Sequence, residues 1–194
     1  MNLGPYREDP LSNNVIPFAL FPLISIFSFM FYPDKSDTAV IIGIIASSVM
    51  VAASVVTKVK NLQYYLNWRL GLVLLFTDSM MLFFALTIAR AYGKLLPGIL
   101  LLLLMLLAIV ISHKFAERLL DEIHSPKTKF GKGLILIGTV GSGAGAMIGY
   151  ISTQTIGVHI AGPVGFAAML IVVGIFHARF QLVAIEKKYG AFDK

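Results

Sequence analysis

The sequence contains no cysteine and little charge. None of its 194 residues is Cys, and only 13% are Asp, Glu, Lys or Arg, roughly half the charged fraction of a soluble protein. The lack of cysteine excludes disulfides, thiolate nucleophiles, iron–sulfur clusters and Cys-type zinc sites. The lack of charge argues against a soluble domain, because 57% of the residues are hydrophobic and they occur in long blocks. With a mean hydropathy of +0.83, the composition predicts an integral membrane protein.

Six apolar segments predict a bundle of six transmembrane helices in a single all-α membrane domain spanning residues 1–194. The helices are expected at about 15–31, 38–57, 70–89, 95–123, 133–152 and 160–182. A helix needs ~20 residues to cross the hydrocarbon core at 1.5 Å per residue. The fourth helix should leave the membrane after Ser112 and continue as a cytoplasmic extension. The first is the shortest and contains Pro17 and Pro22, so we expect it to be bent or partly re-entrant.

The basic residues predict that both termini are cytoplasmic. With the N-terminus inside, the inner segments hold thirteen of the 16 Lys and Arg residues, and the outer loops hold only Lys35, Arg90 and Lys94. Because Lys and Arg are retained on the cytoplasmic side, we expect an N-in/C-in protein of a bacterial or archaeal cytoplasmic membrane. An odd number of crossings would require one segment, most plausibly the first, not to span. The basic stretch "SPKTKFGK" is expected to contact anionic lipid, and no nucleic-acid partner is expected.

One carboxylate lies inside an apolar run, "LVLLFTDSMMLFF". Asp78 falls eight residues after Leu70, about 12 Å into the membrane. A charge at this depth costs about 3 kcal/mol or more. Asp78 is therefore expected either to be protonated and hydrogen-bonded between helices, or to face a hydrated path where it binds a cation or relays a proton. The path is our working hypothesis. Hydroxyl-bearing residues at neighbouring predicted depths complete this polar layer: Thr77, Ser79, Ser47, Ser48, Ser142, Thr139 and Ser25.

The fifth segment, "GLILIGTVGSGAGAMIGY", predicts close helix packing. Small residues let helix backbones approach in lipid, and glycines recur here at Gly138, Gly141, Gly145 and Gly149. We expect this helix to be central, or to bind a protein partner or a second copy of the chain. The segment also matches the glycine pattern of dinucleotide-binding folds, but no Asp or Glu follows between Gly145 and Arg179 to bind a ribose.

Two short stretches, "GSGAG" and "HIAGPVG", resemble the serine and histidine segments of rhomboid intramembrane proteases. The resemblance implies a pair formed by Ser142 and His159. Ser142 is predicted at mid-membrane and His159 in an outer loop, roughly 10 Å or more apart along the membrane normal. A nucleophile and its base must lie about 3 Å apart. We therefore assign no catalytic residue and do not expect an enzyme.

Four potential metal ligands recur on the predicted extension of the fourth helix. Their spacing of i, i+4, i+8 and i+11 places them on one face, and imidazole and carboxylate groups so arranged can bind a divalent metal. The four are His113, Glu117, Asp121 and His124. An amphipathic helix resting on the membrane explains the same pattern, and we favour it, expecting no metal or cofactor. His177 and Arg179, near the inner end of the sixth helix, are expected to reach the membrane interface.

These observations leave two expected functions. The first is a transporter, channel or solute-binding component that uses the layer around Asp78 to move or bind a small solute or a cation such as the proton. The alternative is a non-catalytic subunit, assembly factor or immunity-type factor of a larger membrane complex. Length, six helices and internal termini also suit the substrate-binding subunits of energy-coupling-factor vitamin transporters. The A-x-x-x-A pattern of those proteins is missing from the first segment, and we do not assign that family.

Overall fold

The computed structural model describes residues 3–8, 15–125, 127–129, 131–133 and 158–189. Over these residues the regular elements are all helices, apart from a single β-bridge between Tyr6 and Tyr65. Four helices are long and apolar enough to cross a membrane: α3 (Asp37–Val59), α4 (Leu66–Tyr92), α5 (Leu95–Lys114) and, within α8 (Val158–Phe180), the stretch Ile160–Phe180. These helices fit an integral membrane protein. The chain divides into two compact units, Met1–Leu102 and Leu103–Lys194.

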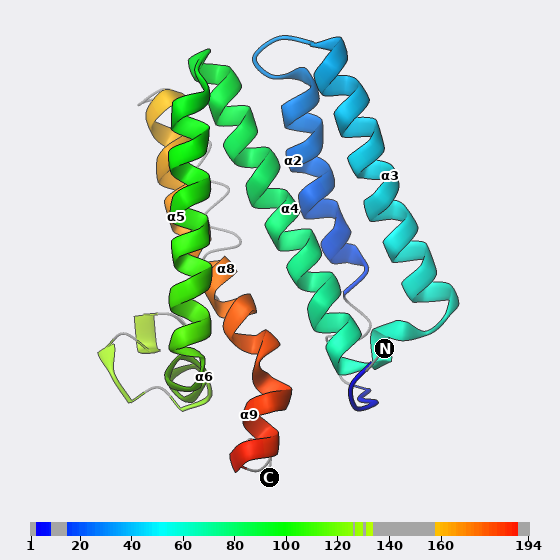
Figure 1. Ribbon diagram of the computed structural model, residues 1–194, viewed down its shortest axis with the longest axis vertical. Helices are drawn as coiled ribbons and strands as arrows, with labels where there is room; N and C mark the ends of the chain where they lie inside the picture. Colours follow the sequence, from blue (N-terminus) through cyan, green and yellow to red (C-terminus); the bar gives the residue numbers. More distant parts are fainter. Residues whose placement is uncertain (1–2, 9–14, 126, 130, 134–157, 190–194) are drawn as a thin grey trace. The chain divides into compact units, whose positions relative to one another are not determined.

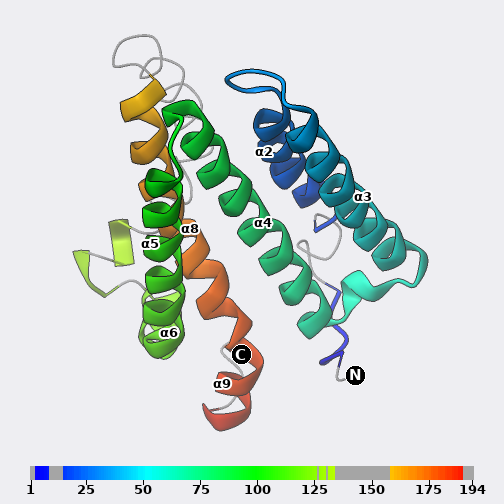
Figure 2. The same cartoon turned by 45° about the horizontal axis from the view of Figure 1, so that its top comes forward.

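In the first unit, α2 (Leu20–Phe31) packs against both α3 and α4. Figure 1 shows the chain running along α2, returning along α3 and then following α4, so that α2 and α4 are parallel and α3 is antiparallel to both. The order α4, α2, α3 is the same in the rotated view (Figure 2). Helix α2 therefore forms the centre of a three-helix layer.

The first apolar segment is shorter than the other helices of its unit. It consists of the 3₁₀ turn η1 (Pro17–Ala19) followed by α2, about 24 Å in all, which is less than the ~30 Å hydrocarbon core. Neither proline lies in the interior of α2, and a re-entrant path for this segment stays a prediction. Pro17 opens η1 and Pro22 lies in the first turn of α2, where a helix tolerates a missing N–H.

Helix α4 is fixed at both ends. The residue that precedes it, Tyr65, offers no side-chain cap. The backbone N–H groups of Leu66 and Asn67 instead donate to the carbonyls of Pro5 (3.0 Å) and Leu3 (3.1 Å). These bonds satisfy N–H groups that lack intrahelical partners. Helix α4 thus begins four residues before the predicted Leu70, held by the N-terminal segment.

The opposite end of α4 is joined to α2. The guanidinium of Arg90 donates to the backbone carbonyls of Phe29 and Asp34 and lies 5.4 Å from the centre of the Phe29 ring. The Phe29 ring in turn lies 5.4 Å from that of Phe83. Arg90, predicted only as an outer-loop charge, therefore caps the end of α2 and holds it against α4.

In the second unit the predicted continuous helix 95–123 is wrong. Helix α5 ends at Lys114 and α6 (Ala116–His124) begins after a break at Phe115, whose φ is −110°. The break turns the apolar side of α6 toward α8 and α9 (Leu182–Tyr189). A small core forms there from four buried side chains: Ala116, Leu120, Ala178 and Ile185. Burial of these groups stabilises the change in helix direction.

The contact between α2 and α3 gives a first prediction. A side chain added at Gly43 would overlap Met30 and press on the fully buried Ile26. Gly43→Leu should therefore destabilise the protein by about 1–3 kcal/mol, the usual cost of overpacking. Thermal unfolding followed by circular dichroism in one detergent measures this effect.

Ala52→Leu is the matched control, because Ala52 is exposed on the same helix. It should leave the midpoint unchanged. Equal midpoints for the two variants would contradict the packing of α2 on α3.

Candidate functional site

Asp78 lies at the middle of α4. It follows Leu66 by twelve residues and precedes Tyr92 by fourteen, about 18 Å and 21 Å from the two ends of the helix. Its side chain is half-buried, and the preceding Thr77 is buried. The structure thus places Asp78 nearer the helix centre than the count from Leu70 did, because α4 extends beyond the predicted apolar segment at both ends.

The register of α2 against α4 brings a second predicted residue to this level. The rings of Phe29 and Phe83 are in contact, and the two helices run parallel. Ser25 precedes Phe29 by four residues and Asp78 precedes Phe83 by five, so Ser25 and Asp78 lie within about one helical turn of each other along the helix axes. Ser25 is half-buried, beside the buried positions of α2.

Helix α3 contributes a third residue near the same level. Gly43 lies against Ile26 and Met30 of α2, and α3 runs in the opposite direction. Four residues further along α3, Ser47 therefore falls about level with the residue preceding Ser25. Ser47 is also half-buried. Three helices of one unit thus carry a polar side chain at nearly one height.

The hydroxyl groups nearby are bonded to their own helices. Thr77 Oγ1 donates to the carbonyl of Val73 and Ser48 Oγ to that of Ile44, both at 2.8 Å. Such bonds use the hydroxyl proton and leave the oxygen lone pairs available as acceptors. Ser48 is exposed, whereas Ser79 is half-buried. A hydroxyl bonded in this way, such as that of the buried Thr77, can still accept a hydrogen bond or coordinate a cation, whereas Ser48 points away from the interior of the unit.

Part of the predicted site lies outside the described residues. This holds for Thr139 and Ser142 of the polar layer and for the packing glycines Gly138, Gly141, Gly145 and Gly149. The close helix packing expected of the fifth segment stays a prediction. So does its binding of a protein partner or of a second copy of the chain.

The four potential metal ligands are not gathered into one set. The break at Phe115 separates His113, in α5, from Glu117 and Asp121, in α6. Asp121 instead forms an exposed ion pair with Lys127, 3.0 Å apart. Among the described residues, no three His, Asp or Glu side chains converge as metal ligands; the side chain of His124 lies outside them.

A histidine pair that the sequence reasoning missed lies in the second unit. His113 Nε2 is 3.1 Å from His177 Nδ1, and Gln181 Nε2 is 2.5 Å from His113 Nδ1. The Gln181 amide nitrogen can only donate, so His113 Nδ1 accepts and its Nε2–H donates to His177. The side chain of His177 is buried against His113; the position of His177 and Arg179 at the membrane interface stays a prediction. In the sequence, the one indication of this pair is that His113 and His177 each lie near the end of an apolar segment.

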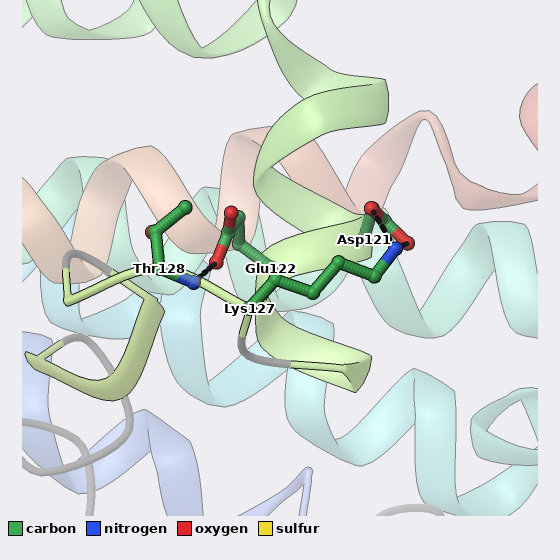
Figure 3. A network of polar contacts seen from close by, with 4 residues as sticks. All are labelled: Asp121, Glu122, Lys127 and Thr128. Atoms are coloured by element: carbon green, nitrogen blue, oxygen red, sulfur yellow. Dashed lines mark hydrogen bonds and ion pairs between the residues drawn. The ribbon is translucent and has the colours of Figure 1, made fainter.

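The chain after α6 folds back onto that helix (Figure 3). The buried carboxylate of Glu122 accepts a hydrogen bond from the backbone N–H of Thr128 at 3.2 Å, beside the pair formed by Asp121 and Lys127. Thr128 Oγ1 accepts a further bond from the N–H of Gly131, also 3.2 Å. Glu122 thus orders the start of the basic stretch.

No family model, curated protein or solved structure matches the chain. The candidate site therefore rests on its own residues and their placement.

The Glu122 network yields a prediction with an internal control. A Cβ added at Gly131 would overlap the Glu122 carboxylate and lie 2.9 Å from its backbone oxygen, which cannot move cheaply. Gly131→Ala should therefore release the segment from α6 and speed tryptic cleavage at Lys127 and Lys129, both exposed.

A Cβ at Gly133 meets no atom of the described residues within 4 Å, and Gly133→Ala should be cleaved at the rate of the unaltered protein. Identical rates for the two variants would exclude a Glu122-bound segment.

Proposed function

We propose that the protein binds or moves a small cation, with the proton as first candidate, through a polar layer centred on Asp78. The observation that carries the proposal is the half-buried carboxylate midway along α4, a helix of 27 residues. A carboxylate at mid-membrane costs several kcal/mol and is a functional candidate by default. Carboxylates also bind cations and exchange protons. A hydrogen bond with a purely structural role would not require a carboxylate.

The surroundings of Asp78 support this proposal. Of the residues in the apolar span of α4, 56% are buried, against 17% in α3, so α4 is the more enclosed helix. Ser25 lies near the level of Asp78 on α2, the helix that packs against α4, and its hydroxyl offers an oxygen acceptor. Ser47 lies near the same level on α3, beyond α2. Such oxygens can replace part of the hydration shell of a cation or hold a protonated carboxyl. The proposal assigns no catalytic residue to the chain.

We further propose six crossings with both termini in the cytoplasm. The distribution of Lys and Arg supports this orientation: the loop after α3 follows Lys58 and Lys60, whereas the loop before it holds only Lys35. In this arrangement the Asp78 layer separates an inner basic surface from an outer surface with few charges.

Proton flux into proteoliposomes tests the function. With a potassium diffusion potential as driving force and a pH-sensitive dye inside, the unaltered protein should acidify the lumen faster than protein-free liposomes. Asp78→Asn keeps the shape but removes the titrating group, and should reduce the rate to that of protein-free liposomes. Asp34→Asn, at an exposed loop position, is the control and should retain full flux.

Equal flux for Asp78→Asn and the unaltered protein would reject Asp78 as the functional group. No flux of protons or of other small cations with the unaltered protein, together with a partner that co-purifies in mild detergent, would favour the alternative function as a subunit or assembly factor.

A further inference from the structure

A hollow of about 290 Å³ opens at the break between α5 and α6 in the second unit. Polar and charged side chains dominate its walls, with an apolar contribution from α9. The principal lining residues are His113, Lys114, Glu117, Arg118, Gln181 and Ile185. None of them belongs to the Asp78 layer, so the hollow is a separate feature of the molecule.

The hollow lies where two apolar spans end. Helix α5 has 20 residues, ending at Lys114, and its length of about 30 Å equals the thickness of the hydrocarbon core. The apolar span of α8 ends at Phe180, one residue before Gln181. The apolar spans of α5 and α8 thus both end beside the hollow. If both helices cross the membrane, the hollow lies at the level of the lipid headgroups.

The charges around the hollow favour an anion. The lining includes two exposed basic side chains, Lys114 and Arg118, and one carboxylate, that of Glu117, so its Lys, Arg and Glu side chains sum to a net positive charge. The nitrogens of His113 are engaged by Gln181 and His177, which leaves Lys114 and Arg118 as the cationic ligands.

An apolar surface continues from the hollow along α5. Leu106, Leu107 and Val110 are exposed on this helix, and Phe115 is exposed at the break itself. A ligand with an anionic head and long hydrocarbon chains fits a basic hollow beside an apolar helix surface better than a free anion does.

We propose that this hollow binds the phosphate of an anionic phospholipid, with Lys114 and Arg118 holding the headgroup and the acyl chains lying along α5. Each basic residue near a membrane surface strengthens anionic lipid binding severalfold. The site is distinct from the contact expected for the stretch "SPKTKFGK".

Native mass spectrometry of the full-length protein in detergent tests this proposal, with added phosphatidylglycerol or phosphatidylcholine. The unaltered protein should retain phosphatidylglycerol in preference to phosphatidylcholine. The double variant Lys114→Gln/Arg118→Gln should bind phosphatidylglycerol roughly tenfold more weakly. The matched control Lys58→Gln/Lys60→Gln removes two exposed charges from the end of α3 and should bind as the unaltered protein does.

Three results would overturn the proposal: full retention of phosphatidylglycerol by the double variant, an equal loss in the control, or displacement of the lipid by excess inorganic phosphate, which would indicate a free-anion site. Arg118→Lys preserves the charge and should retain binding. If the double variant unfolds, the single variant Lys114→Gln takes its place, and binding equal to that of the unaltered protein then counts against the site.

Discussion

A carboxylate among hydrocarbon must be compensated, because lipid offers it neither water nor hydrogen-bond donors. This constraint governs the first unit. Asp78 lies on α4, which has far more of its apolar span buried than α3, and the adjacent helix α2 brings Ser25 to nearly its level. The level is maintained because α4 is tied to the N-terminal segment at its start and, through Arg90, to α2 near its end. The contacts at the two ends of α4 thus set the height of Asp78 relative to α2.

Hydrophobic patterning predicts the helices well and their ends poorly. Five expected helices appear among the described residues, as η1 with α2, α3, α4, α5 and α8, since long apolar blocks leave few alternatives to a helix. Helix α4 exceeds its predicted range because Asn67 and Arg90 stay helical through tertiary contacts that hydropathy cannot register. The break at Phe115 was unpredictable for a similar reason. It depends on a core in which Ala116 and Leu120 of α6 pack with Ala178 of α8 and Ile185 of α9, more than fifty residues later in the sequence.

The candidate site was predicted only in part. Counting 1.5 Å per residue sets the position of Ser25, Ser47 and Asp78 along their helices, and their assembly into one polar layer in the membrane stays a prediction. Side-chain direction depends on helix rotation, which the sequence does not specify here, and Ser48 is exposed instead. The pairing of His113 with His177 requires the register of α5 against α8. Likewise, Glu122 is recognisable as a loop-ordering group only once the following segment folds back.

The most direct test of this account is the depth of the α4 midpoint in a bilayer. Because the chain has no cysteine, a fluorophore can be attached at a single introduced Cys without other changes. Ser79→Cys retains Asp78, and Lys35→Cys and Lys60→Cys, beyond the two ends of α3, serve as shallow references. Lipids with nitroxides near the acyl-chain ends should quench the label at position 79 most strongly, whereas headgroup nitroxides should quench the two references. Strongest quenching of position 79 by headgroup nitroxides would place Asp78 at the surface and contradict the account.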